Sequence, residues 1–307
     1  MNRIILAFIA LAILAGEPAF AKRTKNGQPS APAPGNVVAG FLLKKQAAEK
    51  GDAEAQFQTG WCYKTGNGVE PDAVEAVKWF RKAAEQEHAE AQFTLGSCYE
   101  EGSGVNKDPD EALKWFLKSA KHGYLMAMHH LGDSYLRGTI VPKDEKQGVG
   151  WYRKAADKDF KPSQYELGRC YEFGVGVDKS LKTAIGWYRK AACCHMCAQY
   201  RLGLFYRNGY GVPKNLHESF QYFQLAAENY HRDACYYVGL CYQNGEGTPK
   251  NLGEAVKAYK KGQVSANPAG IKCKAALHRI QQQFPDRYAV YNLFDEMPGG
   301  RAAKREE

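Results

Sequence analysis

Four neighbouring residues in the middle of the chain have side chains that bind metals or form covalent links. They are Cys193, Cys194, His195 and Cys197. Thiolate and imidazole are the usual ligands of zinc, but structural zinc sites generally combine two separated pairs of ligands, and no second pair is evident in the sequence. The same thiols could form a disulfide or remain free. We therefore predict no metal site and no cofactor, and the choice between disulfide and free thiol stays open.

A second motif with possible chemistry is Gly-x-Gly, which recurs along the chain. In nucleotide-binding proteins such glycines cradle a phosphate, but only between a strand and a following helix. Here the motif lacks a preceding strand pattern and returns at regular intervals, in four copies followed by valine: Gly66 and Gly68, Gly102 and Gly104, Gly174 and Gly176, Gly209 and Gly211. These glycines are therefore predicted to form turns.

The glycines belong to a repeat that covers most of the chain. One further glycine marks each copy, and the markers are 36 residues apart, with one interval of 35: Gly60, Gly96, Gly132, Gly168, Gly203 and Gly239. Three residues after each marker stands a tyrosine, and nineteen after it stands a column of Trp79, Trp115, Trp151, Trp187, Tyr222 and Ala258. A period of this length is typical of a solenoid.

One copy contains two predicted helices. Ala91, Leu95, Cys98 and Tyr99 are spaced i, i+4, i+7 and i+8, which places them on one face of a first helix, helix A. Gly-x-Gly then reverses the chain. A residue that can cap the start of helix B follows twelve positions after each marker: Asp72, Asp108, Asp144, Ser180, Asn215 and Asn251. Helix B carries the Trp/Tyr column, which we expect to pack between repeats as core.

The combined motif LG-x-x-Y-x-x-G-x-G-V followed by A-x-x-W-[FY]-x-K-A-A resembles the Sel1-like repeats. This family is related to the tetratricopeptide repeats and has a longer loop between the helices. The resemblance covers about residues 51–264. It implies an all-α fold, an α/α superhelical solenoid of about six Sel1-like helix-loop-helix repeats with terminal capping helices. It also implies a scaffold that binds a protein or peptide partner rather than an enzyme.

The repeat divides the nine cysteines into two groups. Cys62, Cys98, Cys170 and Cys241 occupy one column on the apolar face of helix A. Stacked helices lie about 8–10 Å apart, and a disulfide needs Cα atoms within about 7 Å, so these four are interpreted as small buried residues. The others are candidates for disulfides of unknown pairing: Cys193, Cys194, Cys197, Cys235 and Cys273. Secreted, cysteine-rich Sel1-like proteins pair cysteines eight residues apart, a pattern that Ala227 prevents for Cys235.

The two ends of the chain differ in composition from the repeats. Residues 1–21 combine Arg3, an apolar run and Ala19-Phe20-Ala21, a pattern typical of a secretory signal peptide cleaved after Ala21. We expect a flexible leader over 22–36, an N-terminal capping helix over 37–51, six repeats over 52–265, a C-terminal capping helix over 266–284 and a partly disordered tail over 285–307. The mature protein is thus expected in the periplasm or outside the cell, without an integral membrane segment.

The chain has a formal net charge of +9. Many of its Lys and Arg residues lie in the Lys-Ala-Ala ends of helix B, where positive charge suits the negative end of the helix dipole. No aromatic and basic recognition motif accompanies the charge. We therefore predict no nucleic-acid partner.

An enzymatic alternative follows from the resemblance, because some cysteine-rich members of the family have been linked to β-lactam binding or hydrolysis. Lys64-Thr65-Gly66 resembles one fragment of the serine β-lactamase motifs, but Ser-x-x-Lys and Ser-Asp-Asn are absent from the sequence. The fragment also lies where a turn needs Gly66. We therefore favour a binding protein over an enzyme.

The candidate binding residues lie three positions before each marker, where every copy has an aromatic residue: Phe57, Phe93, His129, Tyr165, Tyr200 and Tyr236. By resemblance to tetratricopeptide repeats, this part of helix A faces the concave groove, together with the position after the marker, which holds Trp61 and Arg169. The rings offer apolar contacts, and Arg169 offers a fork for a carboxylate or a backbone carbonyl. The alternative is that the rings pack on the neighbouring helix A and belong to the stack.

Overall fold

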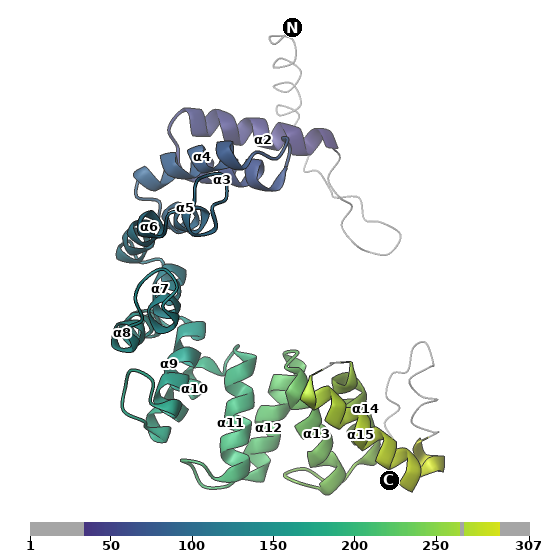
Figure 1. Ribbon diagram of the computed structural model, residues 1–307. Helices are drawn as coiled ribbons and strands as arrows, with labels where there is room; N and C mark the ends of the chain where they lie inside the picture. Colours follow the sequence, from purple (N-terminus) through teal and green to yellow (C-terminus); the bar gives the residue numbers. More distant parts are fainter. Residues whose placement is uncertain (1–33, 265–266, 289–307) are drawn as a thin grey trace, which may run out of the picture. The chain divides into compact units, whose positions relative to one another are not determined.

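The computed structural model describes residues 34–264 and 267–288, and throughout this part of the chain the regular secondary structure is helical (Figure 1). The predicted signal peptide, most of the leader and residues 289–307 of the tail lie outside the described residues. No described helix is long and apolar enough to cross a membrane. The chain divides into two compact units, one ending at Ala83 and the other beginning at Ala84. The prediction of an all-α fold is confirmed for the described residues.

The first unit contains α2 (Pro34–Glu49), α3 (Ala53–Thr65) and most of α4 (Ala73–Glu85). Helix α2 therefore begins within the stretch in which the sequence predicts the leader. Phe41 of α2 is buried, and its ring meets that of Tyr63 edge to face at 5.4 Å. A Cβ added to Gly68 would lie 2.6 Å from the carbonyl oxygen of Val37. Glycine is thus required where α2 crosses the loop after α3.

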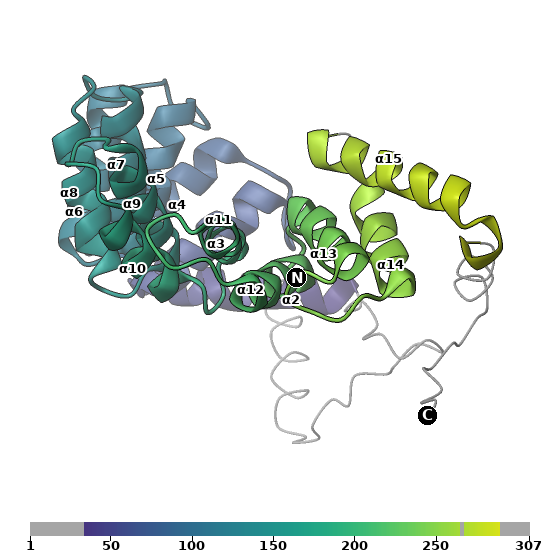
Figure 2. The same cartoon turned by 90° about the horizontal axis from the view of Figure 1, so that it is seen from below.

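The second unit continues the alternation of helix A and helix B. Each A helix packs against the B helix that follows it, and α15 packs against α14 and α13 (Figures 1 and 2). The A helices are α5 (Ala89–Glu101), α7 (Leu125–Arg137), α9 (Lys161–Phe173), α11 (Met196–Asn208) and α13 (Arg232–Asn244). The B helices are α6 (Pro109–Lys121), α8 (Glu145–Ala156), α10 (Leu181–Ala191), α12 (Leu216–Glu228) and α14 (Leu252–Gln263), and α15 spans Pro268–Gln283.

The helix boundaries follow the capping residues of the sequence. The Asp108 carboxylate accepts hydrogen bonds from the backbone N–H groups of Asp110 and Glu111 and so opens α6. Gly102 closes α5 with φ at 75°, in the left-handed region. Gly138 closes α7 in the same way at φ 68°, although the rest of its loop differs in sequence from the other copies. Local chemistry therefore fixes the start of α6 and the ends of α5 and α7, whereas α7, α9, α11 and α13 begin without a side-chain capping bond.

The most deeply buried ring of each helix B is not the expected tryptophan. The fully buried rings lie one residue later in helix B, at Phe80, Phe116, Tyr152, Tyr188, Phe223 and Tyr259. Trp115 is 7% exposed against 0% for Phe116. Trp79 and Trp115 are buried as core, as expected, whereas Trp151, Trp187 and Tyr222 are only half-buried and pack against the edges of core clusters. A lysine three residues later covers the indole, as Lys118 does for Trp115 with its Nζ 4.1 Å from the ring.

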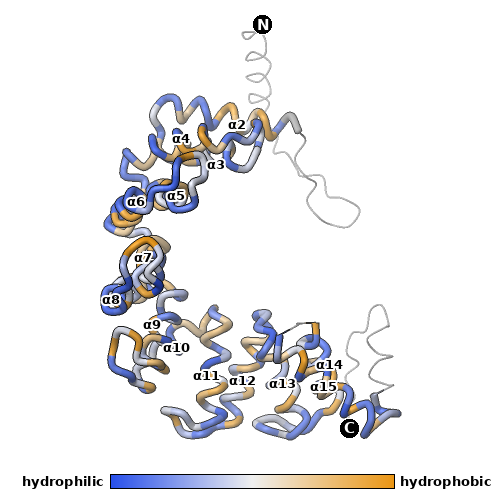
Figure 3. Tube along the Cα trace, in the orientation of Figure 1, coloured by the Kyte–Doolittle hydropathy of each residue, from blue (hydrophilic) through white to orange (hydrophobic). Residues whose placement is uncertain are grey.

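The buried ring of helix B explains the marker glycine of helix A. A Cβ added to Gly168 would lie 2.7 Å from Cε1 and 2.8 Å from Cδ1 of Tyr188. Carbon atoms do not approach so closely without repulsion. The absence of a side chain at the marker therefore lets the buried ring of helix B pack directly against the backbone of helix A in the same repeat. Figure 3 shows apolar and polar residues alternating along the helices, as expected for helices that bury one face.

A glutamine column links successive repeats. The side-chain amide of Gln199 donates a 2.7 Å hydrogen bond to the carbonyl oxygen of Ala192, and Gln164 donates to Ala156 at 3.1 Å. Both glutamines are buried. Because the last carbonyls of a helix have no partner within that helix, this bond satisfies a group that packing would otherwise leave unpaired. The glutamine stands four residues before the marker, a position that the sequence analysis did not single out.

Candidate binding surface

In the first unit, the two candidate residues differ in exposure. Phe57 is 6% exposed and packs on Phe80 at a ring distance of 5.8 Å, whereas Trp61, one helical turn later, is 38% exposed. The Trp61 ring meets Phe57 edge to face at 6.2 Å, and Nζ of Lys64 lies 5.0 Å from its centre. In this unit, therefore, Trp61 is the residue that presents an aromatic surface to solvent.

In the second unit, each candidate ring of α5, α7, α9 and α11 lies between two other rings. One belongs to the buried column of helix B, and the other stands at the start of the next helix A. Tyr165 lies 5.7 Å from Tyr188 and is stacked at 4.5 Å on His195. Phe93 contacts Phe116 and Tyr124, His129 contacts Tyr152 and Phe160, and Tyr200 contacts Phe223 and His231.

This arrangement gives the candidate rings a part in the stack as well as an exposed edge. Phe93, His129, Tyr165, Tyr200 and Tyr236 are all half-buried. His129 also hydrogen-bonds through Nδ1 to the Ser163 hydroxyl at 2.9 Å. Burial lowers the pKa of His129 and of His195 below the ordinary value for histidine. Both imidazoles are thus favoured in their neutral form, which suits ring packing.

Arg169 is close to Tyr165 on α9, but its guanidinium already has a partner. Its Nη1 lies 3.0 Å from Oε2 and 3.4 Å from Oε1 of Glu166, one turn earlier in the helix. The Arg169 side chain is nevertheless 47% exposed, against 25% for that of Glu166. Burial raises the pKa of Glu166 above its usual value, and the nearby Asp133 carboxylate adds to this effect. A ligand carboxylate would therefore compete with the partly buried Glu166 carboxylate for the Arg169 guanidinium.

A second arginine continues this polar band on the next A helix. Nη2 of Arg201, in α11, lies 3.2 Å from Oε1 of Glu172 in α9, and the other carboxylate oxygen of Glu172 accepts a 2.6 Å hydrogen bond from the Tyr188 hydroxyl. Asp133 of α7, one helical turn earlier relative to the marker than Glu172, accepts a hydrogen bond from the equivalent tyrosine, Tyr152. The hydroxyls of the buried tyrosines thus fix acidic side chains on successive A helices. The sequence analysis did not identify Glu166, Glu172 or Arg201 as candidate residues. Each lies within four positions of a marker glycine, so its place on helix A could have been inferred from the repeat.

The candidate cysteines occupy two regions of the second unit. Cys193 and Cys194 are exposed between α10 and α11 with their Sγ atoms 3.4 Å apart, and Cys197 is half-buried in the first turn of α11. Cys235 in α13 and Cys273 in α15 are buried. Within the described residues, no group of three or more His, Cys, Asp and Glu side chains is arranged to hold a metal ion. The cysteine column of the A helices is buried, as predicted.

The fragment Lys64-Thr65-Gly66 forms the end of α3. The Thr65 hydroxyl donates to the carbonyl oxygen of Trp61 at 2.7 Å, and Gly66 is the helix cap with φ at 73°. These contacts account for the three residues by helix termination. No described contact joins them to a nucleophile and a base.

Comparison with known proteins relates the chain to one family of repeats. A family model described as the Sel1 repeat matches residues 53–88, 89–124, 125–160, 161–195, 198–231 and 232–262. No curated protein sequence matches the chain. A solved structure of a protective antigen from uropathogenic Escherichia coli strains, displaying an SLR fold, has a TM-score of 0.70 and 31% identity over 84% of this chain; the matched region spans 56% of that protein.

A second solved structure, a Sel1 repeat protein from Oxalobacter formigenes, has a TM-score of 0.65 and 28% identity. The match covers 74% of this chain and 99% of that protein. Both solved structures and the family model agree on the repeat type and on the helical fold.

Proposed function

Because the chain belongs to the Sel1 repeat family, a scaffold fold that generally supports protein–protein interaction, we propose that it is a non-catalytic binding protein whose partner is an extended peptide or a protein loop. The proposed recognition surface lies on α9 and α11 of the second unit, around Tyr165, Arg169 and Tyr200. The observation that carries this proposal is the exposed guanidinium of Arg169 beside a half-buried aromatic ring.

The chemistry of this surface suits a peptide with an acidic side chain next to an apolar one. The exposed edges of Tyr165 and Tyr200 supply apolar area with little side-chain entropy to lose. Arg169 and Arg201 supply planar hydrogen-bond donors, each already oriented by a carboxylate. A guanidinium held in this way loses little further freedom when a ligand carboxylate joins it.

The proposal can be tested with a displayed library of random peptides selected on the folded chain. We expect the selected peptides to contain an acidic residue near an aromatic or aliphatic one. Their affinity, measured by titration calorimetry, should fall at least about tenfold, or about 1.4 kcal/mol, in Arg169→Ala. The double variant, Tyr165→Ala with Arg169→Ala, should bind the selected peptides no more tightly than Arg169→Ala alone.

Two controls separate binding from folding. Lys182→Ala removes the same charge from an exposed position on α10 and should leave affinity unchanged. The melting temperature of Arg169→Ala should stay close to that of the original chain, because its ion pair with Glu166 is partly solvated. If Arg169→Ala binds the selected peptides normally, or if the double variant melts much earlier while its folded fraction binds normally, the aromatic column is part of the stack and the recognition surface lies elsewhere.

We also propose that the protein is exported and acts in the periplasm or outside the cell, on the strength of the pattern in residues 1–21. The β-lactam alternative has no specific support from the described contacts of Lys64, Thr65 and Gly66. Incubation of the purified chain with a chromogenic β-lactam tests it directly. Hydrolysis that tracks the protein through purification would contradict the non-catalytic proposal.

A further inference from the structure

The last repeat departs from the pattern of the others at two buried positions. Twenty-three residues after the marker, five repeats have a small side chain that is 0% exposed: Ala83, Ser119, Ala155, Ala191 and Ala226. The sixth repeat has Gly262 there. Four residues before the marker, four repeats have the buried glutamine and the third has the buried Met128, whereas the sixth has Cys235. Both departures occur where the repeat meets α15.

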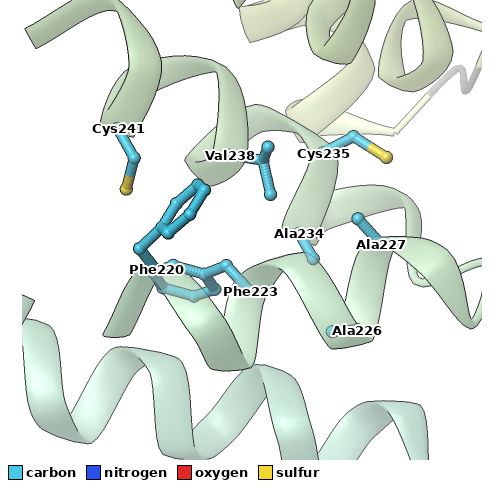
Figure 4. Packing of buried hydrophobic residues seen from close by; sticks show 8 residues of the cluster. All are labelled: Phe220, Phe223, Ala226, Ala227, Ala234, Cys235, Val238 and Cys241. Atoms are coloured by element: carbon cyan, nitrogen blue, oxygen red, sulfur yellow. The ribbon is translucent and has the colours of Figure 1, made fainter. Parts of the chain in front are cut away.

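The two departures bring Cys235 and Cys273 next to Gly262. A Cβ added to Gly262 would lie 2.6 Å from Sγ of Cys273 and 3.1 Å from Cβ of Cys235. The sulfur of Cys273 thus fills the space that a methyl or hydroxymethyl group fills in the other repeats. Figure 4 shows the Cys235 side chain pointing away from Phe220 and Phe223. Cys235 is 3% exposed and Cys273 0%.

We propose that Cys235 and Cys273 form a disulfide that ties α15 to the last repeat. A disulfide places the Cβ atoms of its two cysteines about 3.8 Å apart, and Cβ of Cys235 and Sγ of Cys273 both lie next to Gly262. The Cys235 thiol lies 3.9 Å from the carbonyl oxygen of His231 in its own helix, so it must turn toward Cys273 when the bond forms. An alanine at 262, as in four of the other repeats, would occupy that gap. The glycine and the two cysteines are therefore complementary parts of one arrangement rather than three separate substitutions.

The link has a structural purpose at this end of the solenoid. Helix α15 covers the apolar side of α13 and α14, burying Ala276, Leu277 and Ile280. A terminal helix has neighbours on one side only, so it opens more easily than an internal one. A disulfide between α13 and α15 closes a long loop that includes all of α14. A long loop loses more chain entropy on closure than a short one, so the bond disfavours the state in which α15 is detached.

The reaction is thiol–disulfide exchange with a small-molecule or protein disulfide as oxidant. The thiolate of one cysteine attacks a sulfur of the oxidant, whose S–S bond breaks and releases one thiol. The second cysteine then attacks the mixed disulfide, forms the Cys235–Cys273 bond and releases the second thiol. The oxidant gains the two electrons and the two protons that the cysteines lose.

The timing of this step follows from burial. Burial raises the pKa of Cys273 to about 12 and that of Cys235 above its usual value, so little thiolate exists while α15 is docked. Oxidation is therefore expected when α15 is undocked, during folding or transient opening, and reduction of the docked bond should be slow for the same reason.

The test uses the full chain, reduced and then refolded with oxidised glutathione. Remaining thiols are alkylated, and the protein is digested without reduction for mass spectrometry. We expect a peptide that joins Cys235 to Cys273, with fragmentation excluding Cys241 as the linked residue. Cys193→Ala should retain this peptide. If Cys235 and Cys273 are both alkylated, or are linked to other cysteines, while the exposed Cys193 is oxidised, the proposal is wrong.

A second measurement keeps the test independent of any one variant. Amide hydrogen exchange in α15 should slow by about tenfold or more on oxidation of the original chain. The same treatment should leave exchange unchanged in Cys273→Ala, a variant whose folding is checked by circular dichroism. Gly262→Ala should lose the crosslinked peptide because its methyl group fills the gap. Equal protection of α15 in oxidised and reduced protein would contradict the proposed role.

Discussion

Replacement of glycine by alanine is expected to have opposite effects at Gly168 and Gly186. Both residues lie inside helices, α9 and α10, and alanine is a better helix former than glycine by about 1 kcal/mol at each position. Their surroundings differ. A Cβ at Gly186 would meet nothing within 4 Å, whereas one at Gly168 would lie 2.7 Å from the Tyr188 ring.

The magnitude at Gly168 follows from the immobility of that ring. Tyr188 is 0% exposed, and its hydroxyl donates a 2.6 Å hydrogen bond to Glu172, so the ring cannot turn aside without breaking this bond. Overpacking of this kind destabilises a protein by about 1–3 kcal/mol. Because the Tyr188 ring is buried and its hydroxyl is hydrogen-bonded, we expect a destabilisation near the upper limit, about 3 kcal/mol. After the gain in helix propensity, Gly168→Ala should destabilise the fold by about 2 kcal/mol. Gly186→Ala should stabilise it by about 0.5–1 kcal/mol.

The comparison is made by urea denaturation followed by far-UV circular dichroism. The midpoint should move to lower urea for Gly168→Ala and to slightly higher urea for Gly186→Ala, with similar slopes for both. The pair is matched because the chemical change and the helical setting are the same. Equal shifts of the two midpoints, or a Gly168→Ala variant more stable than the original chain, would refute the explanation of the marker glycine.

Three further predictions concern other parts of the chain. Trp115→Ala should destabilise the fold by about 3–5 kcal/mol, because Trp115 is buried, and a near-neutral midpoint in denaturation would contradict its packing role. Intact-mass spectrometry of protein from its native source should show a chain that starts near Lys22, whereas retention of residues 1–21 would exclude cleavage. Burial lowers the pKa of His195 and His231, so the unfolded chain binds more protons; their stabilising contribution is full above about pH 6.5 and is lost as the pH falls below that value. His195→Phe with His231→Phe should therefore reduce the fall in melting temperature between about pH 7 and 5, and an unchanged fall would contradict this account.

The sequence alone determined the helices and their order, because helix ends depend on local chemistry. Asp108 can cap a helix and Gly102 can adopt a positive φ wherever the chain then goes. The spacing of Gly60, Gly96 and the later markers likewise revealed the repeat without knowledge of its packing. These signals lie within a few residues of the feature that they predict, or recur at a fixed interval.

Only the tertiary structure decided which of two adjacent aromatic residues packs on the marker glycine and is fully buried. Trp115 and Phe116 are one position apart, about 100° around the helix, and both are aromatic residues on its buried side. Periodicity cannot separate them, but the contact with Gly96 can, since a Cβ there would lie 2.8 Å from the Phe116 ring. Trp115 is also buried, but Phe116 is the ring that packs on the marker glycine.

Contacts between repeats were also beyond the reach of the sequence. The partner of Arg201 is Glu172 in the preceding A helix, and the candidate partner of Cys235 is Cys273 in α15. Such pairs depend on the rotation between successive helix pairs, which is set by how side chains interlock rather than by the period. The period says that two helices are neighbours. The packing of their side chains decides which atoms meet.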